Sequence, residues 1–307
     1  MIKVENITKF YGNVCALDNI SFEIQKGEII GFLGPNGAGK TTTMRIITCY
    51  LSPTKGTVKI GNYDIIENPI EVKKCIGYLP ENNPLYDDMG VIEYLEFIAD
   101  LRNLERSIKK EQIKKVVNIC GLKGVVSKNI GELSKGYRQR LGFAQAIISD
   151  PEILILDEPT SGLDPNQARE VRNLIKELKK QKTVILSTHI LSEVQATCDR
   201  VLIINKGKII ASGTTDELQS LVAGKEKIYF EIRSNKDVSQ NLAQIKNIEN
   251  IVLIKKEDSI LGYEIESKID IREQLFEIAV ENKWIVRDLH QEKISLEDVF
   301  RKLTQET

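Results

Sequence analysis

One stretch of the chain has the residue types and spacing of a phosphate-binding loop. The pattern Gly-x-x-x-x-Gly-Lys-Thr runs from Gly34 to Thr41. Glycines let successive backbone N–H groups converge on phosphate oxygens, Lys40 can reach the terminal phosphates, and the Thr41 hydroxyl can ligate Mg²⁺. The pattern therefore predicts a phosphate site formed by Gly34, Pro35, Asn36, Gly37, Ala38, Gly39, Lys40, Thr41 and Thr42.

Two carboxylates follow an apolar stretch later in the chain. Residues 153–156 are all apolar and are followed by Asp157 and Glu158. An aspartate in that place can hold Mg²⁺ through water, and the next glutamate can orient and polarise an attacking water molecule. A solvated surface pair is the alternative, since charged residues commonly end apolar strands. The phosphate loop favours the catalytic interpretation, with Asp157 at the metal and Glu158 at the water.

These groups need a scaffold, and the apolar runs of the sequence predict an α/β core. Near-continuous apolar runs are typical of strands buried on both faces of a parallel sheet. Such runs occur at residues 29–33, 153–156, 184–187 and 201–204, and helical spacing follows Gly39 and Ser134. Residues 2–7 and 20–24 alternate apolar with polar side chains, which predicts antiparallel strands beside the main sheet.

The region between the two chemical motifs is helical and rich in charge. Ile113, Val116 and Val117 share one face at helical spacing, so we expect a helical subdomain within about residues 85–150. The lysines at 109, 110, 114 and 115 could form a basic patch, but the interspersed glutamates favour a solvated helix face. With a net charge of -1, the chain has no overall field that attracts nucleic acid, and we expect no such partner.

The distribution of apolar residues also limits where the chain works. A membrane-spanning helix needs about 20 predominantly apolar residues, and the runs in this sequence are much shorter. The first residues lack the apolar core of a secretory signal, which predicts a cytoplasmic protein. Five cysteines occur without a Cys-x-x-Cys pair, so we expect reduced thiols in the core rather than disulfides or zinc ligands.

The pattern changes near residues 221–227, where we place a domain boundary. We expect an ATP-binding domain over residues 1–222 and an accessory domain over residues 225–307. The second segment reads strand, helix, strand, strand, helix, strand, which predicts a small α+β domain of the ferredoxin-like type. A last amphipathic helix follows, with Leu296, Val299, Phe300 and Leu303 at helical spacing, and Trp284 is expected to fill the domain core.

Further motifs occur in the order found in the ATP-binding cassette (ABC) family, which the chain resembles over about residues 2–220. Residues 133–140 read Leu-Ser-Lys-Gly-Tyr-Arg-Gln-Arg and stand where the family has its signature, usually Leu-Ser-Gly-Gly-Gln. The resemblance implies that Ser134 and Gly136 bind the γ-phosphate of a nucleotide held by an opposite subunit. Lys135 and Tyr137 depart from the usual residues, and a plain helix N-cap at Ser134 is the alternative.

His189, the loop at residues 161–164 and Tyr11 also match the family, whereas Glu81 departs from it. His189 follows a buried strand and resembles the switch histidine, implied to contact the γ-phosphate and orient the water; a structural histidine is the alternative. Residues 161–164, Ser-Gly-Leu-Asp, resemble the loop that meets the opposite subunit. Tyr11 matches the aromatic that stacks on adenine, unless it is a core tyrosine. Glu81 stands where the family more often has a glutamine that coordinates Mg²⁺.

The resemblance implies a fold and an activity. The fold class is α/β, a P-loop NTPase ABC cassette with a mixed sheet core, antiparallel N-terminal strands and a helical subdomain, plus the small C-terminal α+β domain. The implied cofactors are ATP and Mg²⁺. We expect the cassettes to pair as a homodimer or heterodimer, and a separate transmembrane permease to keep them on the inner face of the cell membrane.

The signature variant and the ending at residues 294–300 are similar to an exporter branch that includes gliding-motility and multidrug-export ATPases. The resemblance therefore implies an ATPase that energises export. The alternative is a soluble ABC ATPase that acts on ribosomes or DNA, because fold alone does not set function. Such proteins typically carry paired cassettes, coiled coils or zinc insertions, whereas this sequence has one phosphate loop and no cysteine cluster. A non-enzymatic binding module would leave Glu158 and His189 unexplained.

Overall fold

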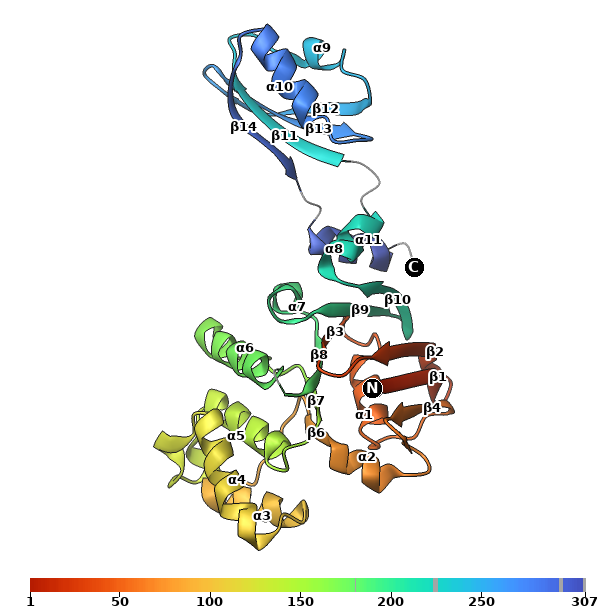
Figure 1. Cartoon of the computed structure of the whole chain (residues 1–307), viewed down its shortest axis with the longest axis vertical. Helices are drawn as coiled ribbons and strands as arrows, with labels where there is room; N and C mark the ends of the chain where they lie inside the picture. Colours follow the sequence, from red (N-terminus) through yellow and green to blue (C-terminus); the bar gives the residue numbers. More distant parts are fainter. Residues whose placement is uncertain (180, 223–225, 293–294, 306–307) are drawn as a thin grey trace. The chain divides into compact units, whose positions relative to one another are not determined.

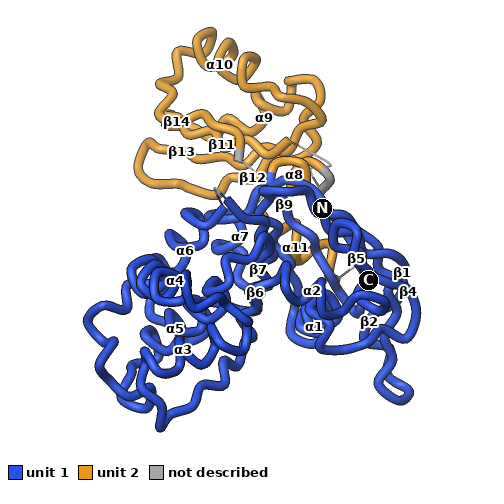
Figure 2. Tube along the Cα trace, turned by 60° about the horizontal axis from the view of Figure 1, so that its bottom comes forward, with its two compact units in different colours: residues 1–215, 307 blue, residues 216–306 orange. Residues whose placement is uncertain are grey.

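The computed structural model describes residues 1–179, 181–222, 226–292 and 295–305. By their internal contacts these residues form two compact units, the first covering Met1–Thr215 and the second Asp216–Glu306 (Figure 2). The division lies before the predicted boundary at residues 222–225. Helix α8 (Thr215–Val222) accounts for the difference, because nearly all of it groups with the second unit.

A six-stranded sheet forms the centre of the first unit. Its strand order is β10-β9-β3-β8-β7-β6, and every neighbouring pair is parallel except β10 with β9. The strands are β3 (Ile29–Leu33), β6 (Ile76–Leu79), β7 (Ile153–Asp157), β8 (Thr183–Thr188), β9 (Arg200–Asn205) and β10 (Lys208–Gly213). β3, β7 and β8 are buried along their whole length, as their apolar runs predict.

Successive side chains of the central strands enter two different hydrophobic cores. In β7, Leu154 and Leu156 pack into a core shared with the helical subdomain, whereas Ile153 and Ile155 pack into one shared with the N-terminal strands. Alternate residues of a strand point to opposite faces. Figure 1 shows the sheet between these two groups of elements. The central strands therefore need an apolar residue at every position, because each side chain enters one core or the other.

A second sheet of four antiparallel strands accompanies the first, in the order β2-β1-β4-β5. Its strands are β1 (Ile2–Tyr11), β2 (Val14–Ile24), β4 (Lys55–Ile60) and β5 (Tyr63–Asp64). Helices α1 (Lys40–Ile47) and α2 (Pro69–Cys75) contribute Met44, Ile47 and Val72 to the core on this side. The antiparallel N-terminal strands agree with the alternating pattern in the sequence.

The opposite face of the main sheet carries the helical subdomain. It consists of α3 (Val91–Leu101), α4 (Arg106–Ile119) and α5 (Lys135–Ile147), with short 3-10 turns at Lys123–Val125 and Ile130–Glu132. Ile113, Val116 and Val117 of α4 are buried, while Lys110 and Lys114 on its other face are exposed. Helices α6 (Pro165–Lys179) and α7 (Leu191–Thr197) complete the unit. Among the described residues, no helix has the length and apolar character needed to cross a membrane.

The second unit contains a four-stranded antiparallel sheet in the order β12-β13-β11-β14. Its elements run β11 (Glu226–Arg233), α9 (Ser239–Leu242), β12 (Ile248–Glu257), β13 (Ile260–Ser267), α10 (Arg272–Glu281) and β14 (Ile285–Glu292), followed by α11 (Leu296–Gln305). This is the element order of a ferredoxin-like unit. Phe230, Tyr263 and Leu275 are fully buried in its core, and Trp284 packs against that core.

The cysteines differ in their surroundings, which corrects the prediction that all five are core thiols. Cys15 lies in β2 and is exposed, whereas Cys120 has 2% of its surface exposed. Burial raises the pKa of the Cys120 thiol to about 12. A thiol reacts with alkylating reagents as its thiolate, so Cys120 stays protonated and inert at mildly alkaline pH.

Brief alkylation of the native protein at pH 8 should therefore modify Cys15 and leave Cys120 unmodified, as read by peptide mass spectrometry. Treatment in denaturant should label both residues, and Cys15→Ser should remove the fast reaction. Labelling of Cys120 as fast as Cys15 in the native protein would show that the helical subdomain is not packed as described.

Candidate active site

The phosphate loop lies between the central strand β3 and helix α1. Gly34 passes so close to β9 that an added Cβ would lie 2.4 Å from the carbonyl oxygen of Ile204. Gly39 has a φ of 111°, a conformation that side chains rarely allow. Lys40 is the first helical residue, and its ammonium donates hydrogen bonds to the carbonyls of Gly34 at 2.8 Å and Pro35 at 3.2 Å. The motif thus folds into the compact loop that the sequence predicts.

Asp157 is held at the carboxyl end of β7 by a neighbouring strand. The parallel register places it opposite Ser187 of β8, whose hydroxyl donates to Asp157 Oδ1. The Thr41 hydroxyl lies 3.4 Å from the same oxygen. The residue is completely buried, and within the described part of the chain its other oxygen, Oδ2, has no hydrogen-bond partner.

A buried carboxylate oxygen without a donor is unusual in a protein interior. It suits a hard cation or a water molecule bound to one, because Mg²⁺ prefers oxygen ligands and keeps several waters. Thr41 and Asp157 therefore fit a magnesium site of the kind predicted from their types.

Glu158 follows in a strained conformation that directs its carboxylate toward the loop. Its φ is 49°, in the left-handed region, and its backbone N–H donates to the Ser187 carbonyl at 3.0 Å. The carboxylate oxygens lie 2.9 and 3.0 Å from His189 Nδ1, and one lies 3.7 Å from Lys40 Nζ. The carboxylate is thus held between an imidazole and an ammonium group at the edge of the phosphate loop.

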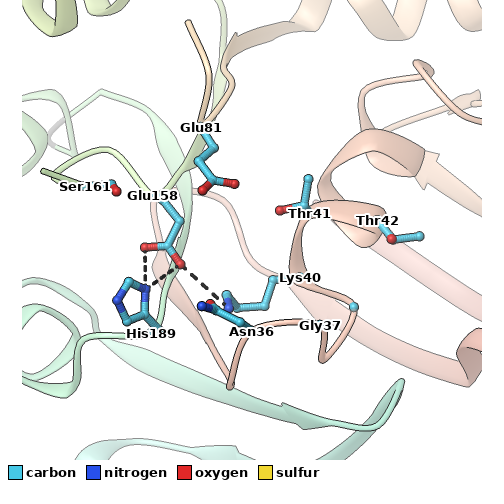
Figure 3. Close-up of a pocket in the computed structure, with 10 residues that line it drawn as sticks. Asn36, Gly37, Lys40, Thr41, Thr42, Glu81, Glu158, Ser161 and His189 are labelled. Carbon is cyan, nitrogen blue, oxygen red and sulfur yellow. Dashed lines mark hydrogen bonds and ion pairs between the residues drawn. The ribbon is translucent and has the colours of Figure 1, made fainter.

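A cavity of about 360 Å³ joins these groups (Figure 3). It is lined by Asn36, Gly37, Gly39, Lys40, Thr41, Thr42, Glu81, Glu158, Ser161 and His189. Figure 3 shows the Glu81 carboxylate directed into the space between Glu158 and Thr41. Loop, carboxylate, imidazole and Glu81 come from distant parts of the sequence, and the fold brings them to one place.

Gly34, Pro35 and Ala38 belong to the phosphate loop but do not line the cavity, and three more residues predicted to touch nucleotide also lie outside this lining. Tyr11 ends β1 with 45% of its surface exposed, so the core alternative is wrong. Ser134 is the N-cap of α5 and accepts a hydrogen bond from Tyr137 N at 3.5 Å. Gly136 packs against the end of the Gln167 side chain, which would have to shift to admit a Cβ. The cap interpretation of Ser134 describes this chain, and a role toward a second chain is left as a proposal.

Sequence reasoning placed Ser187 in a strand but gave it no role. A serine at the end of an apolar strand is a weak signal, and its importance appears only when the register sets it opposite Asp157. Ser161, which the resemblance assigns to a loop at the opposite subunit, also lines the cavity of its own chain.

Comparison with known proteins identifies the family. A family model described as ABC transporter matches residues 17–161. The chain is 39% identical to the uncharacterized ABC transporter ATP-binding protein MJ1023 of Methanocaldococcus jannaschii, over 97% of each protein. The chain belongs to the ABC transporter ATP-binding proteins. This confirms the predicted family and the activity that it implies, an ATPase that energises transport.

Two further proteins extend the comparison. The ABC cassette is 35% identical to the bacitracin transport ATP-binding protein BcrA of Bacillus licheniformis, over 99% of this chain and 97% of that one. It also matches a solved structure, the dimeric ATP-binding cassette MJ0796 in a post-hydrolysis state bound to ADP and Pi, at 26% identity. The TM-score is 0.64, over 70% of this chain and 98% of that chain. The predicted cassette fold is confirmed. The bound ADP in that structure shows that a cassette of this family binds nucleotide.

The close approach of Gly34 to Ile204 gives a direct test of the loop. In Gly34→Ala the new methyl group must displace either the loop or β9. The free energy of unfolding should therefore be about 1–3 kcal/mol lower than that of the unmodified protein. Binding of a fluorescent ATP analogue should also be lost.

Gly124→Ala serves as the control, because a Cβ there meets open space. This variant should unfold and bind as the unmodified protein does. Full nucleotide affinity in Gly34→Ala would show that the loop does not need this approach.

Proposed function

We propose that this ABC cassette binds ATP and Mg²⁺ between two cassettes and hydrolyses ATP to drive export through a separate membrane permease. The observation that carries the proposal is the Glu158 carboxylate, fixed between His189 and Lys40 beside the Thr41–Asp157 pair. A protein that only binds nucleotide would not need a buried carboxylate held beside the position expected for an attacking water molecule.

Each group has a role that follows from its position. The loop N–H groups and Lys40 bind the phosphates of ATP, with Lys40 exchanging its carbonyl partners for phosphate oxygens. Glu158 orients and polarises the attacking water, and His189 orients Glu158 and meets the γ-phosphate. Thr41 and Asp157 hold the magnesium, with Glu81 as a further oxygen ligand. When bound, the metal would neutralise charge on the phosphate oxygens.

Two cassettes are needed because the signature residues lie outside the chain's own cavity. Ser134 and the N–H groups near Gly136 open α5, a place suited to anions. We propose that they close on the γ-phosphate held by a second cassette, in a homodimer or heterodimer. The dimeric structure of the cassette MJ0796 supports the pairing of two cassettes.

The permease and the direction of transport are also proposals. The name of BcrA refers to bacitracin transport, and another relative, the linearmycin resistance ATP-binding protein LnrL of Bacillus subtilis, is 33% identical over 88% of the chain. Both names support export as the direction of transport. The cassette would work in the cytoplasm, peripheral on the inner face of the membrane, through its permease. Relatives provide no support for the soluble alternative.

We also propose a division of labour between the two units. The first unit, which contains every residue lining the cavity, is the ATP-binding domain. The second, with its own hydrophobic core, is an accessory domain.

Glu158→Gln tests the catalytic assignment. The amide keeps the shape of the side chain but cannot polarise water, so turnover should fall by about 10²–10⁴-fold while ATP binding persists. Size-exclusion chromatography with ATP should show a stable dimer. Glu177→Gln, on the exposed face of α6, is the matched control and should retain normal turnover. A monomeric Glu158→Gln protein with unchanged turnover would sink the assignment.

Metal dependence tests the Thr41–Asp157 site. Chelation of divalent cations should abolish turnover, and added Mg²⁺ should restore it. In Asp157→Asn, the concentration of Mg²⁺ for half-maximal activity should rise by about 10–100-fold. Asp100→Asn, which alters an exposed ion pair with Lys109, should leave the Mg²⁺ requirement unchanged. If both variants needed the same Mg²⁺ concentration for half-maximal activity, Asp157 would not be a magnesium ligand.

The permease can be captured directly. Tagged Glu158→Gln protein, purified with ATP from detergent-solubilised native membranes, should carry a stoichiometric polytopic membrane protein by mass spectrometry. Recovery with ribosomes or DNA alone would overturn the transport proposal.

A further inference from the structure

Behind the candidate active site lies a buried carboxylate that the mechanism above does not use. Glu193 belongs to α7 and has 4% of its surface exposed. Burying an ionised carboxylate is costly unless hydrogen bonds compensate for lost water. Arg172 of α6 forms an ion pair with it, but its Nη1 lies 3.9 Å from Glu193 Oε1, which is too far for a hydrogen bond.

Two threonines supply the compensation. The Thr160 hydroxyl donates to Glu193 Oε1, and the Thr188 hydroxyl donates to Oε2 at 2.9 Å. Both hydroxyls are buried, with 6% of Thr160 and none of Thr188 exposed. Each oxygen of one carboxylate therefore holds a different threonine, and Glu193 joins two segments of the chain.

The two segments are the ones that carry the reactive groups. Thr160 lies between Glu158 and Ser161, and Thr188 directly precedes His189. Thr188 ends a strand, where neighbouring side chains point to opposite faces. Ser187 and His189 are directed to Asp157 and Glu158, while Thr188 is directed to Glu193.

In addition to the pairing of β7 with β8, side chains thus link the two segments on both sides. On the cavity side the link is the contact between Glu158 and His189, which Figure 3 shows. On the far side the link is Glu193 with its two threonines. A carboxylate that joins both segments restricts their relative movement, and hence the place of the Glu158 carboxylate.

We propose that Glu193 is a positioning residue for ATP hydrolysis: it locks the Glu158 and His189 segments together from behind the cavity. Glu193 is not among the residues that line the cavity. This inference rests on the proposed function, because it assigns Glu158 and His189 their roles in hydrolysis.

The first measurement is steady-state hydrolysis and nucleotide affinity of Glu193→Ala, purified with the membrane proteins that accompany it. Small displacements of reacting groups cost up to about 10²-fold in rate, so kcat should fall at least tenfold. The Kd for ATP should change less than threefold, because the phosphate loop is unaltered. Glu177→Ala on the exposed face of α6 is the control and should match the unmodified protein in both values.

A second variant separates positioning from stability. This triple variant carries Thr160→Val, Thr188→Val and Glu193→Leu together. It replaces all three hydrogen-bonded polar side chains by apolar ones of similar size, a change that is often neutral for stability. The Tm of the triple variant should lie closer to that of the unmodified protein than the Tm of Glu193→Ala does, while its kcat stays as low as that of Glu193→Ala. If kcat recovers together with Tm, Glu193 is merely structural and the proposal fails.

A spectroscopic readout does not depend on turnover. The chain contains two histidines, His189 and His290, and His290 contacts Asp288 and Tyr229 in the second unit. With ¹⁵N-labelled histidine, Glu193→Ala should shift the ring nitrogen signals of His189 and leave those of His290 in place. The variant His290→Gln assigns the two sets. Unchanged His189 signals would overturn the proposal.

The two hypotheses can fail separately. If the unmodified protein does not hydrolyse ATP, the proposed function fails, and the histidine signals still report whether Glu193 holds the His189 segment. If the unmodified protein hydrolyses ATP and Glu193→Ala does so equally fast, the proposed function stands and the inference about Glu193 is wrong.

Discussion

The pairing of β7 with β8 is the interaction on which the candidate site depends. These two strands are parallel, fully buried and in a register that sets Asp157 beside Ser187. The Ser187 hydroxyl orients Asp157, and its carbonyl accepts the Glu158 N–H. A shift by one residue would exchange the two faces of the strand and turn the carboxylates away from the phosphate loop. The apolar cores on both faces of the sheet make that shift unfavourable.

Burial of charge is the second constraint on the site. Lys40, Asp157 and Glu158 each have 6% or less of their surface exposed. Their charges are tolerated because each has close partners: two carbonyls for Lys40, two hydroxyls for Asp157, and His189 with Lys40 for Glu158. The exception is the unpaired Oδ2 of Asp157, described above. In a low dielectric such groups act more strongly on a bound phosphate than they would in water.

The second unit follows the same rules on a smaller scale. Its antiparallel sheet buries one face under α9 and α10, and β13 accordingly alternates Leu261, Tyr263 and Ile265, which are buried in the core, with Gly262, Glu264 and Glu266. Helix α9 covers only Ser239–Leu242, whereas the apolar spacing of the sequence predicts a helix over about residues 238–245. Leu242 is completely buried and Val238 nearly so, which shows that the apolar spacing reflects core packing more than helix length.

The sequence by itself determined the fold class, the phosphate loop and the carboxylate pair. These depend on local pattern: glycine spacing, apolar runs and the residues that end them. The bounds of β3 and the N-cap at Ser134 could also be predicted, because a strand buried on both faces and a helix start each have a local signature.

Only the tertiary structure decided which distant groups meet. Register set Ser187 against Asp157, and a positive φ turned Glu158 toward His189 and Lys40. Contacts also joined Glu193 to Thr160 and Thr188, and grouped α8 with the second unit. Sequence spacing contains none of this, because the partners come from separate elements and their distances depend on how strands pair and helices pack.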